Sequence, residues 1–139
     1  MERSLVLIKP DAMQRRLAGT IISRLEERDL KLVALRMLHL ERALAERHYA
    51  IHAGKSFFAD LIDYITLTPI VAAVFEGEGA IDVIRKIMGA TDPAKAEPGT
   101  IRADFGLDIQ RNAVHSSDSI ETAAREIKLF FTGDEILDY

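Results

Sequence analysis

Hydrophobic residues cluster along this chain in four short segments that are typical of β-strands. Three of them, Ser4–Ile8, Lys31–Leu40 and Pro69–Phe75, are rich in apolar residues, as in strands that are buried in a core. The fourth is an apolar pair inside the polar stretch Arg111–Ser119. The pattern therefore predicts four strands, of which the last is short.

Between these segments, apolar residues recur at helical spacing. Each stretch places an apolar residue on one side every three or four positions, which predicts an amphipathic helix. The predicted helices are Leu17–Leu25, Glu41–Ala53, Phe57–Ile65, Ile81–Met88 and Ile120–Phe130. Asp118 or Ser119 is a suitable N-cap for the last helix. Pro10 is expected to end the first strand.

The order of these elements predicts an α/β fold, more specifically an α+β sandwich. Strands and helices follow one another as in the ferredoxin-like split βαβ arrangement, with a four-stranded antiparallel sheet covered by helices. A chain of 139 residues is long enough for one full core but not for two. We therefore expect a single domain over residues 1–139.

One long stretch, Gly89–Asn112, lacks a regular pattern. Loops of this length inside a compact domain are uncommon, and they are either disordered or functional. The apolar residues scattered along it, Ile101, Phe105, Leu107 and Ile109, are expected to anchor it. The sequence thus predicts an ordered, functional loop immediately before the last strand.

Composition narrows the possible functions. The chain has 18 Lys and Arg against 22 Asp and Glu, a formal net charge of −4, which disfavours a general surface for nucleic acid. The absence of cysteine excludes disulfides and thiol chemistry. No apolar run suits a membrane span and no signal peptide is visible, so we expect a cytoplasmic protein that does not bind membranes.

His115 lies at the predicted junction between the last strand and the last helix. A lone histidine there could be a structural cap. Glu126 on the following helix, however, could fold back to orient the imidazole or a neighbouring serine. That arrangement suits a nucleophilic histidine, whose neutral form is available near pH 7.

Several other segments of the chain carry cations and neutral hydrogen-bond donors that could bind an anion near this junction. Arginines can hold phosphate oxygens by paired hydrogen bonds, which favours a polyphosphate ligand over a single anion. The cations are Lys9, Arg85, Arg102 and Arg111, and Thr91 and Asn112 supply neutral donors. Each arginine alone could equally be a solvated surface charge.

Three other motifs do not meet the requirements of known sites. His48 and His52 are four residues apart, but no third ligand follows at a recognisable spacing, so exposed or packed histidines are the better interpretation. Gly54-Lys55-Ser56 lacks the first glycine of a P-loop, and Gly77-Glu78-Gly79 lacks the third glycine of a dinucleotide fingerprint. None of these motifs indicates a ligand.

Taken together, the motifs make the chain resemble the nucleoside diphosphate kinase family over nearly its whole length. The matching segments are Ile8-Lys9-Pro10-Asp11, Glu46-Arg47-His48-Tyr49, Phe57-Phe58-Ala59, Thr91-Asp92-Pro93, residues 98–105 (PGTIRADF) and residues 112–119 (NAVHSSDS). The last two are highly specific.

The resemblance implies a ping-pong transfer of a γ-phosphoryl group from a nucleoside triphosphate, typically ATP, to a nucleoside diphosphate. By match to the family's site, His115 would carry the phosphoryl group, and Tyr49, Ser117 and Glu126 would position its ring. Lys9 and Asn112 would contact the sugar hydroxyls, with Lys9 also reaching phosphate, while Phe57 would stack on the base and Arg85, Thr91 and Arg102 would hold the phosphates.

The same resemblance implies Mg²⁺ held by nucleotide phosphates and water, without a protein metal cage. It also implies a homo-oligomer, either a tetramer or a hexamer. Because stacking accepts any base, we expect broad base tolerance.

Two positions depart from the family pattern. Ser116 follows His115 where glycine is usual, and it would strain the turn if a positive φ were required there. Lys55 stands where an arginine is common and has no assigned role. Two other functions stay open at this point, a nucleotide-binding module without turnover and, less compatible with the net charge, a nucleic-acid-binding protein.

Overall fold

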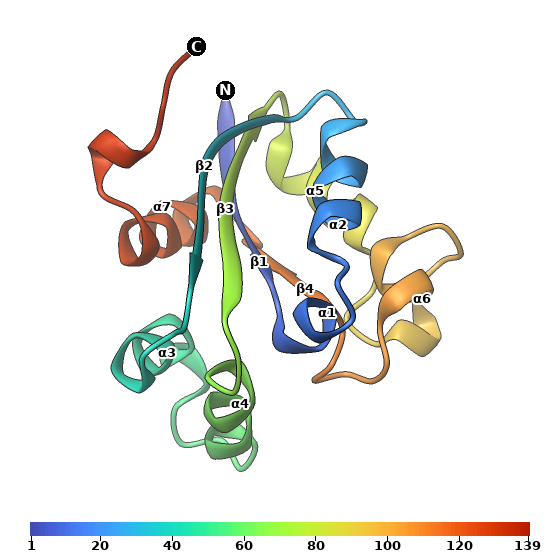
Figure 1. Cartoon of the computed structure of the whole chain (residues 1–139), viewed down its shortest axis with the longest axis vertical. Coiled ribbons are helices and arrows are strands. Elements are labelled where there is room, and N and C mark those ends of the chain that lie inside the picture. Colours follow the sequence, from blue (N-terminus) through green and yellow to red (C-terminus); the bar gives the residue numbers. More distant parts are fainter.

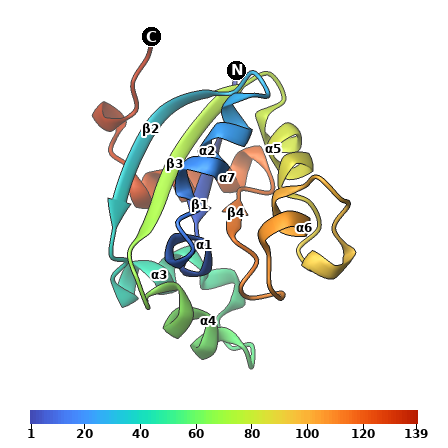
Figure 2. The ribbon, with the colours of Figure 1, turned by 45° about the vertical axis from the view of Figure 1, so that its right-hand side comes forward.

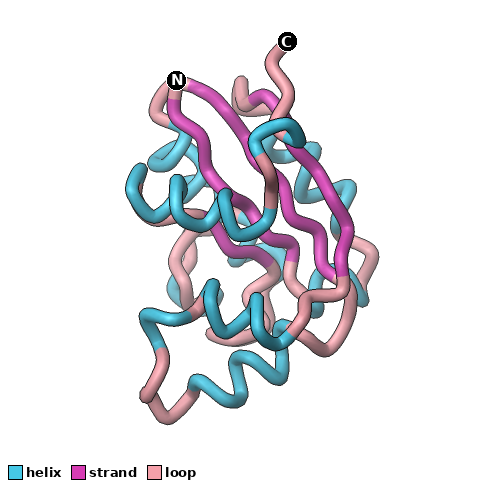
Figure 3. The backbone as a smooth tube through the Cα atoms, turned by 90° about the vertical axis from the view of Figure 1, so that its left-hand side faces the viewer, coloured by secondary structure: helices cyan, strands magenta, loops and turns pink.

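A four-stranded antiparallel sheet forms the centre of the computed structural model, which describes all residues from 1 to 139 (Figure 1). The strands are β1 (Glu2–Ile8), β2 (Lys31–Leu38), β3 (Ile70–Gly77) and β4 (Val114–Ser116), in the spatial order β2-β3-β1-β4. Figure 3 shows the strands side by side, with helices packed on the sheet. This order confirms the predicted ferredoxin-like sheet.

Helices cover both faces of the sheet. The longer helices are α2 (Ala18–Glu26), α3 (Arg42–His48), α4 (Phe58–Ile65), α5 (Ala80–Met88) and α7 (Ile120–Phe130). One core packs α3, α4 and α7 against the sheet, and the other packs α2 and α5 against the opposite face. None of these helices is both long enough and apolar enough to span a membrane.

The strand alternation explains why one sheet serves two cores. Leu5 and Leu7 of β1 belong to the core under α7, whereas Val6 and Ile8 belong to the core under α5. Successive side chains of a strand point to opposite faces, so a strand that is apolar throughout must be covered on both sides. The continuous apolar pattern of β1 and β3 is the sequence signal of this arrangement.

β4 determines where His115 lies. In the register between β1 and β4, His115 is opposite Leu7, and directly opposite residues of an antiparallel pair share one face of the sheet. The imidazole therefore lies on the side covered by α3 and α7. The N-cap of α7 is Ser119, one of the two residues predicted for this position. Its hydroxyl accepts a hydrogen bond from the Thr122 N–H at 3.0 Å.

The segment between α5 and β4 is not an irregular loop throughout. It contains a 3-10 turn, Pro93–Lys95, and a short helix, α6 (Ile101–Phe105), beside β4 (Figure 2). Asp92 and Thr100 cap these two elements. Ile101 is fully buried and anchors the segment as predicted, but Leu107 and Ile109 are exposed, so the expectation that they act as anchors was wrong.

Two of the differences from the predicted element boundaries lie at Pro10 and in the helix after β2. The first strand ends before Pro10 as expected, but Pro10 then begins an unpredicted short helix, α1 (Pro10–Gln14), since proline at the first helical position costs no hydrogen bond. The helix predicted over Glu41–Ala53 ends at His48 and continues as a 3-10 turn, Ala50–His52.

Candidate active site

A cleft of about 560 Å³ opens beside β4, between α3, α5 and the segment that carries α6. Of the predicted site residues, Ser117 and Glu126 are buried behind His115 and Arg111 lies outside the cleft, and all the others line it. The lining residues include Lys9, Tyr49, Phe57, Arg85, Thr91, Arg102, Asn112 and His115. Positions far apart in the sequence thus meet around one cavity.

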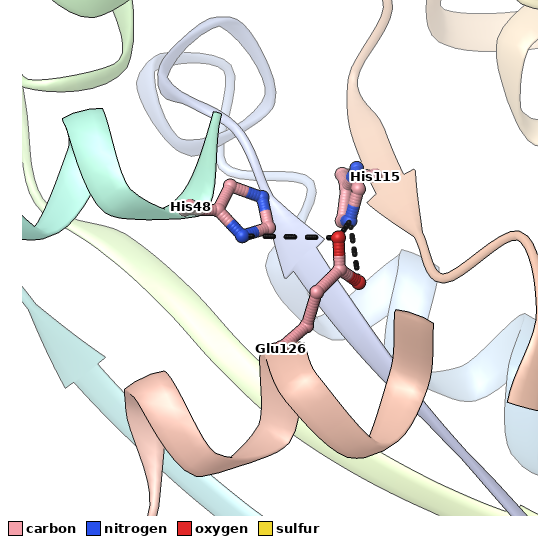
Figure 4. Close-up of side chains that lie close together, drawn as sticks. All are labelled: His48, His115 and Glu126. Atoms are coloured by element: carbon pink, nitrogen blue, oxygen red, sulfur yellow. Dashed lines mark hydrogen bonds and ion pairs between the residues drawn. The ribbon is translucent and has the colours of Figure 1, made fainter. Parts of the chain in front are cut away.

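The His115 ring is held by Glu126 on α7 (Figure 4). Nε2 of His115 lies 3.1 Å from both carboxylate oxygens, and the Ser117 hydroxyl donates to Oε1 at 2.6 Å. The backbone N–H of Leu5 donates to the Ser117 hydroxyl at 3.1 Å, which fixes the serine in turn. A carboxylate facing Nε2 favours the tautomer with the proton on that nitrogen, so Nδ1 keeps its lone pair.

The Glu126 carboxylate is ionised although it is buried. Burial raises its pKa, but the hydrogen bonds from His115 and Ser117 outweigh that effect and lower the pKa to about 2. The side chain is therefore negative at any pH near neutrality. A fixed negative charge beside Nε2 stabilises a positive charge on the imidazole.

His48 lies directly behind His115 and was not predicted to do so. Its ring meets the His115 ring edge-on with centroids 4.7 Å apart, and its Nδ1 is 3.8 Å from Glu126 Oε2, too far for a hydrogen bond. Burial lowers the pKa of His48 to about 3, aided by the neighbouring His115. The contact with Glu126 is therefore not an ion pair at neutral pH.

His48 and His52, which are four residues apart in the sequence, have different surroundings. His48 is buried, whereas Nδ1 of His52 lies 3.1 Å from Lys55 Nζ and its ring is 5.4 Å from that of Phe57. The two imidazoles point to different surroundings. Lys55, unassigned from the sequence, stands next to the Phe57 ring at 5.7 Å.

Lys9 and Asn112 form a buried polar pair at the floor of the cleft. Lys9 Nζ donates to Asn112 Oδ1 at 2.9 Å and to the Gln110 carbonyl at 2.7 Å, and Asn112 Nδ2 donates to the Thr91 carbonyl at 3.0 Å. Burial lowers the pKa of Lys9 to about 8; Asp11 opposes the shift and Arg102 adds to it. This lysine loses its charge at a lower pH than an exposed one.

Arg102 is oriented by two backbone carbonyls. Its guanidinium donates to Gly89 and to Val114, each at 2.9 Å, and burial together with the nearby Arg85 lowers its pKa to about 10. It is still charged at neutral pH. Arg111, grouped with these cations in the sequence, instead pairs with Asp108 at 2.7 Å on the surface and does not line the cleft.

The strained residue of the site is Ala113 and not Ser116. Ala113 has φ of 74°, whereas Ser116 has no positive φ and pairs with Val6 in β4. The Ala113 N–H donates to Asp11 Oδ2 at 3.0 Å, and the Tyr64 hydroxyl donates to the other oxygen of Asp11. A serine after His115 therefore causes no strain. The support of Ala113 by Asp11 was not predicted.

Phe57 is the exposed aromatic of the cleft. Phe57 is 45% exposed, while Phe58 packs against the core. Tyr49 is buried, and its ring centroid is 6.5 Å from that of His115. Phe57 thus lines the cleft with a partly exposed aromatic ring.

Comparison with known proteins agrees with this geometry. A sequence model of the family described as "Nucleoside diphosphate kinase" matches residues 2–136. The chain belongs to this family. Its activity is accordingly that of a nucleoside diphosphate kinase, the transfer of a γ-phosphoryl group from a nucleoside triphosphate to a nucleoside diphosphate.

Individual relatives are similar over their whole length. The nucleoside diphosphate kinase of Archaeoglobus fulgidus is 57% identical over 139 residues, which are 100% of this chain and 92% of the relative. The solved structure of the Aquifex aeolicus nucleoside diphosphate kinase has a TM-score of 0.95 at 41% identity, covering 98% of this chain and 99% of that one. A Halobacterium salinarum nucleoside diphosphate kinase in complex with CDP has a TM-score of 0.97 at 45% identity, covering 99% and 92%.

The lowered pKa of Lys9 predicts that kcat/KM falls at alkaline pH. As pH rises through about 8 the lysine loses its proton, and with it the positive charge that attracts phosphate, so kcat/KM should fall above that pH. The pH profile of kcat/KM for wild type and Lys9→Gln measures this. In Lys9→Gln, kcat/KM should be low at all pH values and lack this alkaline limb; the same limb in the variant would assign it to another group.

Proposed function

We propose that His115 is the nucleophile of the kinase reaction. Nδ1 attacks the γ-phosphorus of the bound triphosphate, the new N–P bond forms, and the bond from phosphorus to the bridging oxygen breaks, which releases the nucleoside diphosphate. A second diphosphate then attacks the phosphohistidine by the reverse route. The observation that carries this proposal is the contact of Nε2 with Glu126.

Glu126 acts on the ring in both half-reactions. Attack through Nδ1 leaves the imidazole with positive charge while Nε2 keeps its proton, and the ionised carboxylate stabilises that charge. Ser117 and Tyr49 are positioning residues, since Ser117 fixes the carboxylate and Tyr49 packs near the ring. Preorganised charge of this kind needs no rearrangement during the reaction.

The cleft would hold the nucleotide by the parts that all nucleotides share. Lys9 and Asn112 would contact the sugar hydroxyls, with Lys9 also near phosphate, and Arg85, Thr91 and Arg102 would bind the phosphates. Phe57 would stack on the base through its exposed face. Stacking does not read base identity, so the enzyme is expected to accept different bases.

Mg²⁺ would enter this site together with the nucleotide. Asp118 is the only carboxylate that lines the cleft, and one carboxylate with phosphate oxygens and waters is a usual environment for this ion. Asp118 is thus the residue placed to accept hydrogen bonds from its waters. When bound, the ion neutralises phosphate charge and holds the phosphate chain in one geometry.

We also propose a homo-oligomer, tetrameric or hexameric, in which the free edge of β2 is covered. β2 is at one end of the sheet, and its side chains Leu35 and Met37 are 52% and 66% exposed. An exposed apolar edge strand is a ready surface for pairing with another chain.

We also propose that residues 1–139 form one domain and that the protein is cytoplasmic.

Covalent labelling tests the nucleophile. Incubation with γ-labelled ATP and Mg²⁺ should put label on the wild-type protein, stable to base and labile to acid, and the label should pass to added GDP. His115→Ala should lose the label while it still binds ADP, because the cations of the cleft are unchanged. Undiminished labelling of His115→Ala would show that another residue is the nucleophile.

A charge on the edge of β2 tests the oligomer. Met37→Glu places an unpaired carboxylate where a second chain would pack, so light scattering should show a lower mass for this variant at micromolar concentration. Leu67→Glu, at an exposed leucine outside β2, is the matched control and should keep the wild-type mass. An unchanged mass for Met37→Glu would place the subunit contact elsewhere.

A further inference from the structure

Three potential metal ligands converge behind the cleft from three different elements. His48 comes from α3, His115 from β4 and Glu126 from α7, with both rings turned toward the carboxylate (Figure 4). One ligand atom of each residue lies within 4.8 Å of the other two. The spacing of these residues in the sequence gave no sign of such a cluster.

His48 has no hydrogen bond that would account for its place. Neither ring nitrogen has a partner, and the side chain is completely buried. A buried polar group without a partner is costly and therefore rare in folded proteins. An imidazole held in this way beside a second imidazole and a carboxylate has a lone pair that a bound cation could use.

The distances suit a small ion of the zinc class. Zinc binds nitrogen and carboxylate oxygen at about 2.0 to 2.2 Å, which puts the ligand atoms of a tetrahedral site roughly 3.3 Å apart. Nε2 of His115 is 3.1 Å from the Glu126 oxygens, and Nδ1 of His48 is 3.8 Å from one of them. The ligand atoms of the two imidazoles lie within 4.8 Å of each other, so closing the site would bring the two rings together by up to about 1.5 Å.

We propose that His48, His115 and Glu126 form a site for a divalent transition metal such as Zn²⁺, and that the bound metal switches the kinase off. A water would be the fourth ligand, and His115, whose side chain is 22% exposed, lines the cleft from which that water would come. The hydrogen bond from Ser117 to Glu126 would orient the carboxylate, as outer partners of metal ligands do. Mg²⁺ would not compete well, because it prefers oxygen ligands.

Inhibition follows because a metal bound to one nitrogen of the His115 ring changes the protonation of the other nitrogen. A metal on Nε2 uses the lone pair there, so the single proton of the neutral ring moves from Nε2 to Nδ1, with no net proton released. Nδ1 then has no lone pair with which to attack phosphorus. This step rests on the proposed role of His115, whereas metal binding itself does not.

Binding is tested with Co²⁺ and Zn²⁺ alone, on the wild-type protein without nucleotide or Mg²⁺. Co²⁺ should bind with one equivalent per chain and give the intense visible bands of a four-coordinate ion, and Zn²⁺ should displace it. His48→Asn and His48→Phe should each weaken binding by about 10-fold or more, because one of three protein ligands is lost. His39→Asn removes an exposed histidine elsewhere and should bind as the wild type does.

Two binding results would overturn the proposal. One is the absence of stoichiometric binding to the wild type. The other is wild-type affinity for Co²⁺ in a His48 variant that keeps the native circular dichroism spectrum. Two variants are used because asparagine and phenylalanine differ in size and polarity, so the same cause would not misfold both.

Inhibition is tested by labelling with γ-labelled ATP at fixed free Zn²⁺, with each protein compared with its own rate without Zn²⁺. Labelling of the wild type should fall over the Zn²⁺ range in which binding occurs, and labelling of His48→Asn should not. Binding without inhibition would overturn the switch but not the proposed nucleophile. Failure of the wild type to label without Zn²⁺ would instead overturn the proposed function.

Discussion

The buried carboxylate of Glu126 is the interaction on which the site depends. It is nearly inaccessible to water, yet neither lysine nor arginine pairs with it. A buried charge without a cation costs free energy unless hydrogen bonds compensate it, and here the Ser117 hydroxyl and the His115 ring do so. The carboxylate therefore fixes which ring nitrogen carries the proton, and this choice leaves the other nitrogen to react.

The fold serves this contact by bringing short elements together with tight supports. β4 has only three residues and reaches the site through Ala113, whose positive φ is unfavourable for a residue with a side chain. The Asp11 carboxylate holds the Ala113 N–H, and the Lys9 N–H holds its carbonyl at 2.9 Å. The strained backbone at Ala113 is thus held by Lys9, which follows β1, and by Asp11 of α1, and this fixes the start of the strand that carries His115.

The sequence predicted the sheet and the longer helices because their apolar periods are strong. It predicted the residues of the cleft through family motifs, and the structure brings them together around one cavity. It could not reveal Asp11 or the place of His48, since Asp11 and Ala113 are 102 positions apart and no local pattern reports such contacts. Helix α6 was missed because five residues are too few to show a period, and Arg111 was misplaced because an exposed Asp108 three residues away holds it.

The most direct measurement of the central claim is the state of the His115 ring before and after phosphorylation, by ¹⁵N NMR of the imidazole nitrogens. The hydrogen bonds to Glu126 predict a ring with a proton on Nε2 in the free protein. After ATP and Mg²⁺ are added, they predict a phosphorus atom on Nδ1 with the Nε2 proton retained. A free protein with the proton on Nδ1, or a phosphoryl group found on Nε2, would contradict the account.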